Sequence, residues 1–579
     1  MPEPTPDRPA EDGAVRSVSL ISRHRSNAVG AGFLKMERML FKMKKLVIFA
    51  FCLLFAGLVP AGAATRGSET IPRPAAVELR TENFRLDRAV GIRCISEGLD
   101  NEASYLREQL AENNSADRDG RLRTCRRVEL SIDGKIPSEG YVLELHPRKI
   151  TVRGGSAAGV FYGIQTLLQE MQDGGVLPYG RIEDAPRYAW RGYMLDEARH
   201  FSGAARVKLL LDQMARFKMN RFHWHLTDEQ GWRIEIKGYP RLATVGGTGC
   251  HSNPDTPAQY YTQEEIRDIV AYAAARHIEI IPEIDMPGHA TASNRAYPEY
   301  SGGGTELHPD FTFNVGKEET YAFLTDVLRE ISALFPSEWL HLGGDEVAYG
   351  SDAWKRDPHV QALMAREGLT TVKQAERYFM RRMADSVRML GKTLVGWDEL
   401  LDLGMDPQQS LVMWWRHDKP DYLLRSLDGA YTTILCPRKP LYFDFVQHAD
   451  HKWGRIWDGF CPLEDVYAFP DAWFEGWGMT PEWSAHILGI QANVWSELMH
   501  TAERVDFMTF PRLCALSEAA WSQPDVKDYG DFMRRMEAVF ASFDRLGIYY
   551  FDPRNPGHHP EPAGPEIIKR QPPKMDFRD

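Results

Sequence analysis

Cysteine and positive charge are both scarce in this sequence of 579 residues. Only seven cysteines occur, none in a C-x-x-C pair, which argues against a zinc ribbon or a redox dithiol. Lys and Arg total 69 against 81 Asp and Glu, giving a formal net charge of −12. Such a chain lacks the basic surface that nucleic-acid binding requires, so we expect no nucleic-acid partner.

Long hydrophobic runs are also lacking, apart from one short stretch near the N-terminus. Residues 46–59 are apolar over a length that is typical of a signal peptide and shorter than the roughly 20 residues of a membrane-spanning helix. Lysines at 44–45 precede this run, and Ala-Gly-Ala at 61–63 follows it as a small-residue cleavage site. We therefore predict a signal peptide over 43–64, and we interpret residues 1–42 as a leader or an over-extended translation start.

A signal peptide implies an exported protein, periplasmic or secreted, whose mature chain has no stable membrane insertion. An uncleaved membrane anchor is the alternative. Six cysteines lie outside the predicted signal peptide. Export would allow some of them to form disulfides, although their spacing does not indicate which.

Residues 65–186 are predicted to form a small α/β domain. Strand-like runs at 141–145 and 149–152 are followed by two glycines and a predicted helix at 156–171. From residue 187 the sequence pattern changes to short apolar runs that alternate with amphipathic helices. The helix at 204–219, for example, carries one apolar stripe.

Eight such strand–helix units span 187–552, which predicts a (β/α)8 TIM barrel preceded by the small α/β domain. The eight expected strands are 191–196, 221–228, 278–285, 339–343, 393–397, 411–415, 432–436 and 487–494. A doubly wound open sheet is the alternative, but no glycine-rich phosphate loop follows the first strand. Residues 553–579, rich in Pro, Gly and charge, are expected to form a poorly packed tail.

Acidic and aromatic residues gather at the ends of these strands, where a barrel of this kind carries its function. A single acid at a strand end would be unremarkable, because most such acids form rim salt bridges. Here nearly every strand ends in an acid, an aromatic residue or both. Carboxyl groups provide acid, base and charge stabilisation, and aromatic rings form walls for a sugar, so the pattern favours a sugar-cleaving site.

His223 and His225 point to the same face of the second strand, because side chains at i and i+2 share a face. Such a pair suits a metal-dependent barrel hydrolase, for which Asp285 and His289 would be available as further ligands. The alternative is that both imidazoles hydrogen-bond to neighbouring carboxylates. We favour the second interpretation and expect neither a metal nor another cofactor.

The adjacent acids Asp345 and Glu346 follow two glycines at the end of the fourth strand. Ordinary glycosidases place two carboxyl groups across the sugar, about 5–9.5 Å apart and on different strands. Sequence neighbours on a strand point to opposite faces, so they can reach one site only past its end, and then from the same side. The pair therefore cannot supply both an acid and a nucleophile in the usual way.

Several motifs, in order, resemble those of glycoside hydrolase family 20, the β-N-acetylhexosaminidases. The matching stretches are RGYMLDEARH (191–200), HWHLTDEQGW (223–232), PEIDMPGH (282–289), HLGGDEV (341–347), GWDE (396–399), WR (415–416), YFD (442–444) and VWSE (494–497). The 65–186 block is similar to the domain that precedes the barrel in this family. The second-strand motif departs mildly, with Glu229 where the family often has a second aspartate.

The resemblance implies an exo-acting enzyme that removes terminal β-linked GlcNAc or GalNAc from glycans with retention. Its nucleophile would be the substrate's own 2-acetamido oxygen, through an oxazolinium intermediate. Glu346 would be the general acid and base, and Asp345 would orient the acetamido group. The implied substrate-binding residues are Arg199, Asp228, His289, Trp397, Trp415, Tyr442, Asp444, Trp495 and Glu497.

The adjacent carboxylate and an apolar wall are expected to raise the pKa of Glu346, while Asp345 stays ionised. A further alternative is a glycan-binding relative without catalytic activity. The full set of matched catalytic residues argues against this alternative. The loops around 250–255 and 448–460 lie outside the resemblance, and the oligomeric state is left open.

Overall fold

The computed structural model describes residues 64–112, 122–172 and 174–567. The predicted signal peptide therefore lies outside the described residues, apart from its last position. Within the described part of the chain, no helix is both long and apolar enough to cross a membrane. The six cysteines found there are all free thiols.

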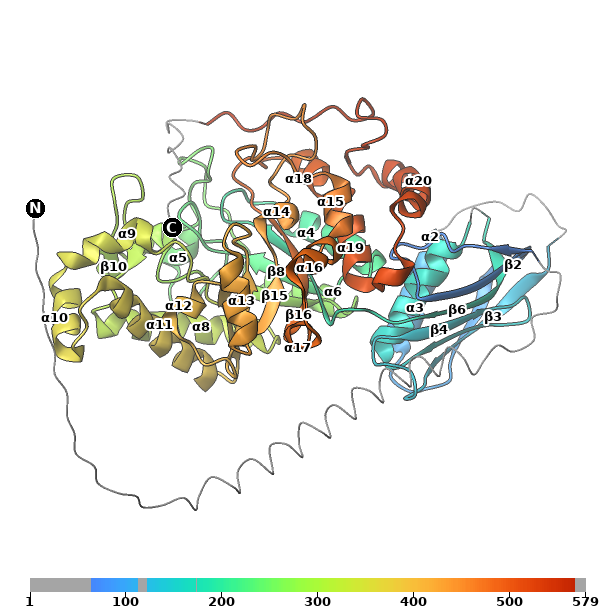
Figure 1. Cartoon of the computed structure of the whole chain (residues 1–579), viewed down its shortest axis with the longest axis horizontal. Helices are drawn as coiled ribbons and strands as arrows, with labels where there is room; N and C mark the ends of the chain where they lie inside the picture. The colour runs from blue at the N-terminus through green and yellow to red at the C-terminus, as the bar shows by residue number, and fades with distance from the viewer. Residues whose placement is uncertain (1–63, 113–121, 173, 568–579) are drawn as a thin grey trace, which may run out of the picture. The chain divides into compact units, whose positions relative to one another are not determined.

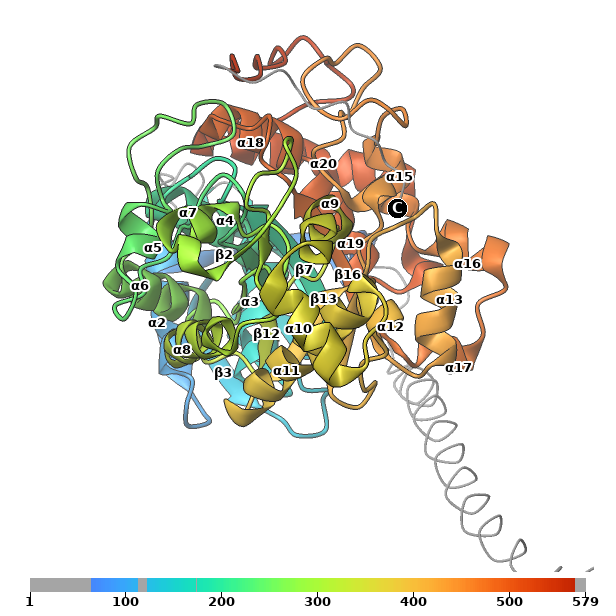
Figure 2. The ribbon, with the colours of Figure 1, turned by 90° about the vertical axis from the view of Figure 1, so that its left-hand side faces the viewer.

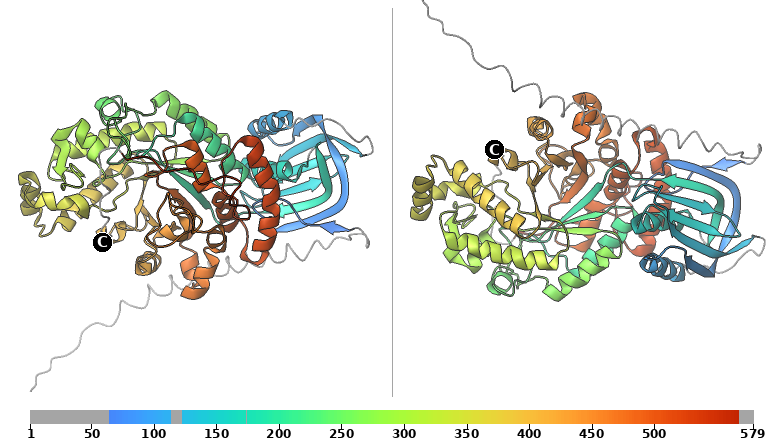
Figure 3. Two further views of the ribbon diagram at one scale, coloured as in Figure 1. Left: turned by 90° about the horizontal axis from the view of Figure 1, so that it is seen from above. Right: turned by 90° about the horizontal axis from the view of Figure 1, so that it is seen from below.

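The first part of the described chain is a six-stranded mixed sheet with helices α2 (Asp100–Glu112) and α3 (Ala157–Glu170) packed against it (Figure 1). The strand order is β1-β2-β3-β5-β4-β6, and β2 also pairs with β6. The strands are β1 (Thr65–Arg66), β2 (Ala76–Cys94), β3 (Thr124–Ile132), β4 (Tyr141–Leu145), β5 (Ile150–Gly154) and β6 (Val176–Asp184). In Figure 3 these blue and cyan strands form a separate layer.

Eight parallel strands then close into a barrel, so the (β/α)8 prediction is confirmed. Figure 2 shows barrel strands at the centre with helices around them. The strands are β7 (Trp190–Asp196), β8 (Arg221–His225), β9 (Glu279–Glu283), β12 (Trp339–His341), β13 (Thr393–Trp397), β14 (Ser410–Trp414), β15 (Thr432–Leu435) and β16 (Ile487–Val494). Ring closure comes from the β16–β7 pairing, in which Ile490 is in register with Arg191.

The main helices around the barrel follow apolar stripes and local caps. On α4 the stripe that includes Val207, Leu211 and Met214 is buried. A capping box formed by Thr262 and Glu265 is present at the start of α6. The longer helices are α4 (Ala204–Arg216), α6 (Gln263–Ala274), α8 (Glu318–Leu334), α10 (Pro358–Glu367), α11 (Val372–Met389), α13 (Pro420–Asp428), α18 (Ala502–Thr509), α19 (Arg512–Trp521) and α20 (Tyr529–Leu546).

Buried charges connect the six-stranded sheet with the barrel. Lys218 Nζ lies 3.2 Å from Asp184 Oδ2, and both side chains are inaccessible to solvent. Arg191 Nη2 lies 2.8 Å from Glu139 Oε1. Removing one partner from a buried pair costs about 3–5 kcal/mol, so these contacts fix the two layers against each other.

The chain beyond α20, described up to residue 567, is mostly exposed or half-buried, but Glu561 connects it to the rest of the protein. Glu561 accepts hydrogen bonds from the backbone N–H groups of Lys452 and Trp453, at 2.8 and 2.9 Å. It also pairs with Arg504 at 3.1 Å. Glu561 is thus one anchor of the tail, a feature that composition does not reveal.

Candidate active site

A buried carboxylate, Glu283, forms the centre of the site at the end of β9. Its oxygens lie 2.9 Å from His223 Nε2, 2.5 Å from His225 Nδ1 and 2.9 Å from His341 Nδ1. The indole N–H of Trp397 donates to it at 2.9 Å. Four neighbouring barrel strands, β8, β9, β12 and β13, are thereby connected through one acid. Both imidazoles of the predicted His pair contact carboxylates.

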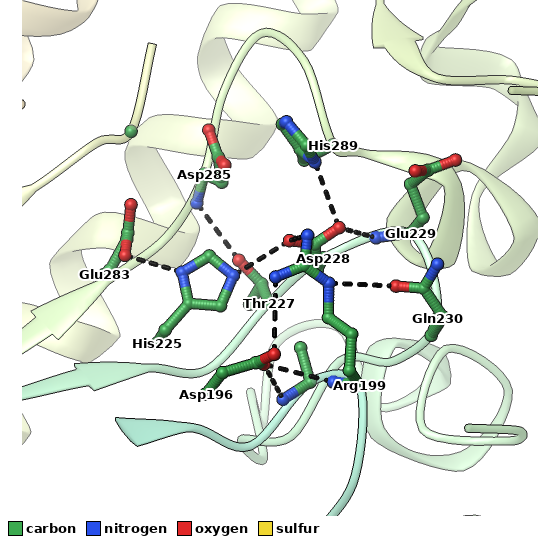
Figure 4. Close-up of polar contacts among 12 residues, drawn as sticks. Asp196, Arg199, His225, Thr227, Asp228, Glu229, Gln230, Glu283, Asp285 and His289 are labelled. Atoms are coloured by element: carbon green, nitrogen blue, oxygen red, sulfur yellow. Dashed lines mark hydrogen bonds and ion pairs between the residues drawn. The ribbon is translucent and has the colours of Figure 1, made fainter. Parts of the chain in front are cut away.

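Asp228 is the second buried acid, and it lies just past the end of β8 (Figure 4). It contacts His225 Nε2 at 2.9 Å, Arg199 Nη2 at 2.7 Å and His289 Nδ1 at 3.0 Å. Burial opposes ionisation, but Arg199 and His289 outweigh it and hold the pKa of Asp228 well below its usual range. The carboxylate is therefore ionised and orients both cations.

His289 joins this network to the adjacent acids. Its Nε2 lies 3.5 Å from Glu346 Oε2 and 3.7 Å from Asp345 Oδ2. Burial disfavours a charged imidazole here, but the charges of Asp228 and neighbouring acids raise the pKa of His289 well above its usual value. Both sequence neighbours thus face one imidazolium, from the same side, as their position past the strand predicts.

The backbone after β12 explains how neighbouring side chains reach one site. Gly343, Gly344 and Glu346 all have positive φ, at 64°, 93° and 51°. A Cβ on Gly343 would lie 1.9 Å from Asp285 Oδ1, so no side chain fits there. Glu346 adopts the left-handed conformation that non-glycine residues rarely occupy and that proteins retain mainly at functional sites.

The pKa values of the pair differ from the sequence expectation. Burial and the charge of Glu346 raise the pKa of Asp345 to about 6, despite the opposing charge of His289. Burial also acts to raise the pKa of Glu346, but contact with His289 and two nearby arginines lower it below its usual value. The prediction for Glu346 was therefore wrong for the free protein. The sequence identifies His289 and Arg199 as site residues but not their distances from Glu346, and Arg455 lies outside every motif.

Four aromatic side chains stand together beside the acid pair. The rings of Trp415 and Tyr442 are stacked at 6.3 Å and 12°, and Trp495 lies 6.1 Å from Tyr442 and 5.9 Å from Trp397. Trp397, Tyr442 and Trp495 are buried. The Trp415 indole N–H donates to Glu399 at 3.1 Å, which fixes its orientation. Such rings can enclose a small apolar group and one face of a sugar.

Asp444 and Glu497, after β15 and β16, are brought together by Arg455, one of the two arginines near Glu346. Arg455 forms an ion pair with Asp444 and lies 3.1 Å from Glu497. Burial raises the pKa of Asp444 to about 6 against the charge of Arg455. Burial would also raise the pKa of Glu497, but Arg199 and Arg455 together lower it to about 2.

Two buried carboxylate oxygens at this site, Asp345 Oδ1 and Asp444 Oδ1, have no hydrogen-bond partner among the described residues. An unpaired buried acceptor costs about 1–3 kcal/mol, so proteins retain such atoms for a reason. Both oxygens are suited to accept an N–H or O–H group from a bound molecule. The structure thus brings all eleven predicted site residues to one end of the barrel, in three connected groups.

Family models match nearly all of the described chain. The model of the glycosyl hydrolase family 20 catalytic domain matches residues 188–524, and that of domain 2 of the same family matches residues 67–185. The chain belongs to glycosyl hydrolase family 20. The resemblance stated from its motifs is confirmed.

Related proteins agree with the family 20 assignment. A beta-hexosaminidase of Porphyromonas gingivalis (strain ATCC BAA-308 / W83) is 36% identical over 513 residues, which cover 84% of this chain and 65% of the relative. The chain therefore spans just under two thirds of that relative's length. A beta-hexosaminidase of Vibrio furnissii is 34% identical over 479 residues, covering 77% of this chain and 75% of the relative.

Solved structures share the family 20 fold. The GH20 exo beta-N-acetylglucosaminidase from Vibrio harveyi, in complex with N-acetylglucosamine, has a TM-score of 0.76 at 31% identity, covering 86% of this chain and 80% of that one. The Streptomyces plicatus N-acetyl-beta-hexosaminidase in complex with Thio-NAglucal has a TM-score of 0.72 at 31% identity, covering 86% and 99%.

Four residues that contribute to this family 20 site were not identified from the sequence. Arg455 lies in the loop 446–461, where no motif marks it. Glu283 and His341 occur within quoted motifs, but their joint role needs the barrel to bring β9 and β12 side by side. Asp398 was likewise only a strand-end acid, yet it pairs with Arg416 and accepts from the backbone N–H of Trp415 at 3.2 Å.

Proposed function

We propose that the protein is an exo-acting β-N-acetylhexosaminidase that removes terminal, non-reducing β-linked GlcNAc or GalNAc from glycans with retention. One observation carries the proposal: two adjacent carboxyl groups, Asp345 and Glu346, approach the same His289 nitrogen. Acids on one side of a site cannot flank a sugar as acid and nucleophile. The nucleophile therefore has to come from the substrate, and a 2-acetamido group supplies one.

In the first step Glu346 gives its proton to the glycosidic oxygen while the acetamido carbonyl oxygen attacks C1. The C1–O bond breaks, the alcohol leaves, and an oxazolinium ion forms. Asp345 accepts the acetamido N–H through its unpaired oxygen and stabilises the positive charge that develops on the nitrogen. In the second step the Glu346 carboxylate takes a proton from water, which adds at C1 and reopens the ring with net retention.

The surrounding residues position the sugar. Tyr442 donates its hydroxyl to the acetamido oxygen, and Trp397, Trp415 and Trp495 enclose the acetamido group and the sugar ring. A second set of polar residues, Arg199, Asp444 and Glu497, binds sugar hydroxyls. Asp228 orients His289, which in turn faces Glu346.

Only one proton is needed between the two acids, and their titration is coupled. The free protein places the higher pKa, about 6, on Asp345. A neutral sugar that fills the pocket displaces water and brings the acetamido N–H to Asp345, which favours its ionised form. The shared proton then resides on Glu346, where the departing oxygen needs it.

We also propose that the protein is exported to the periplasm or secreted. The support is the sequence pattern at 43–64, where an apolar run follows lysines and precedes small residues. N-terminal sequencing of the protein from its native host should find a first residue close to position 64. A mature chain that retains residues 43–63 would contradict cleavage.

The activity test compares release of p-nitrophenol from the β-GlcNAc derivative and from the matching β-glucoside. Only the first carries the acetamido nucleophile, so we expect hydrolysis of the β-GlcNAc compound and none of the glucoside above background. The Glu346→Gln variant serves as the control for contaminating activity. Equal hydrolysis of both compounds would contradict the proposal.

A further inference from the structure

A cluster of metal-binding side chains lies in the C-terminal part of the chain, on elements that carry none of the eleven site residues. Asp544 belongs to α20, and His558 and His559 belong to the segment that follows it. One donor atom from each residue lies within 4.8 Å of the other two. Asp544 and His558 are exposed and His559 is half-buried, so an ion could reach them from solvent.

We propose that Asp544, His558 and His559 bind a divalent transition-metal ion, with zinc as the best match, which anchors the C-terminal tail to α20. Two imidazoles and one carboxylate form a ligand set typical of zinc, with solvent water completing the coordination. Ligand atoms on a tetrahedral zinc ion lie about 3.4 Å apart, given bonds of about 2.0–2.1 Å. His558 Nε2 and Asp544 Oδ1 already lie 3.1 Å apart.

Tyr550 orients two of the three ligands. Its backbone carbonyl lies 3.0 Å from His559 Nδ1, so that nitrogen donates its proton and Nε2 keeps the lone pair that a metal needs. Its hydroxyl donates to Asp544 Oδ1 at 3.2 Å. Metal-ligating histidines nearly always donate the other ring N–H to such a partner, and this arrangement is already present here.

The competing explanation is a plain hydrogen bond, in which His558 Nε2 donates to Asp544 without metal. That hydrogen bond would leave the Nε2 atom of His559 unused, although the His559 ring lies only 4.3 Å from that of His558, at 71°. A metal site uses both imidazoles. The two explanations differ in one measurable quantity, the zinc held by the chain.

Anchoring the tail has a consequence for the active site. Two residues past His559, Glu561 accepts the backbone N–H groups of Lys452 and Trp453. These two residues belong to the loop 446–461, which also carries Arg455 to Asp444 and Glu497. A metal ion that holds the tail therefore also restrains this loop.

The test uses the full chain, stripped with a chelator and dialysed against a fixed micromolar concentration of free zinc. We expect the unchanged protein to bind one more zinc ion per chain than the double variant His558→Ala/His559→Ala. His359, an exposed histidine on α10, gives the matched control His359→Ala, which should bind as much as the unchanged chain. Equal zinc in all three proteins would overturn the proposed site.

A milder variant keeps the test decisive if the double variant folds poorly. Tyr550→Phe removes only the hydroxyl that orients Asp544, and loss of such an outer partner weakens metal binding about 10–100-fold. We expect a weaker zinc affinity in this variant, and an unchanged affinity would contradict the proposed geometry.

Hydrogen exchange tests the anchoring. Zinc should slow exchange at the amides of Lys452 and Trp453 in the unchanged chain and have no effect in the double variant. Zinc binding without any change at these amides would overturn the anchoring role. Neither readout depends on glycosidase activity, so failure here is distinguishable from failure of the proposed function.

Discussion

The Nε2 atom of His289 lies 3.5 Å from Glu346 Oε2, while its other ring nitrogen lies 3.0 Å from the buried carboxylate of Asp228. Glu346 therefore titrates beside an imidazolium whose other ring nitrogen is fixed by Asp228. This contact, together with Asp345 at 3.7 Å from the same nitrogen, sets the charge of the acid pair.

Glu346→Gln should lower kcat/KM on a GlcNAc disaccharide by about 10²–10⁴-fold, because a general acid contributes that much. The loss should be smaller on the p-nitrophenyl glycoside, since p-nitrophenolate leaves readily without a proton. Steady-state kinetics on the two substrates provide the comparison. A variant that loses the same factor on both would argue against the role as acid.

Asp345→Asn should move the alkaline limb of the kcat/KM profile to lower pH. In the unchanged protein, Asp345 and Glu346 together keep one proton up to about pH 6, because burial raises the pKa of Asp345. Without Asp345 that proton belongs to Glu346, whose pKa lies below its usual value. We also expect a loss of about 10²–10³-fold at the optimum. A limb that stays in place would contradict the coupling.

His289→Gln should shift the same limb in the opposite direction, to higher pH. The substitution removes a positive charge that lowers the pKa values of both acids, so each would hold its proton longer. The pH dependence of kcat/KM, measured beside the Asp345→Asn variant, checks the sign. A limb that stays in place or moves to lower pH would contradict a charged His289 in the free protein.

Arg455→Met should raise KM by about 10–100-fold, because it removes charge-assisted hydrogen bonds worth about 1.5–3 kcal/mol from Asp444 and Glu497. Arg455→Lys keeps the charge and serves as the matched control, with a smaller effect. Binding of a GlcNAc-based inhibitor should weaken in parallel. An unchanged KM would mean that these acids are positioned without the loop.

The eight barrel strands were predictable because short apolar runs alternate with amphipathic helices, and the observed strands differ by only a few residues. β8 and β9 end earlier than expected, at His225 and Glu283, because the polar residues beyond them turn toward the site. The adjacency of Asp345 and Glu346 was readable from one motif, and so was its geometric consequence.

Contacts between distant segments were not predictable. Arg455 and Glu561 lie in segments without periodicity or motif, yet each pairs with groups far away in sequence or on another strand. The pKa order of the acid pair was missed for the same reason. It depends on cations that reach Glu346 from other loops, and their distances exist only in the folded chain.

The central claim is that the substrate's acetamido oxygen is the nucleophile, because Asp345 and Glu346 cannot supply one. The most direct measurement is kcat/KM for p-nitrophenyl glycosides whose N-acetyl methyl group carries an increasing number of fluorine atoms. Fluorine withdraws electrons from the carbonyl oxygen, so the account predicts a steady fall in kcat/KM, by orders of magnitude across the series. Rates that do not depend on fluorination would contradict it.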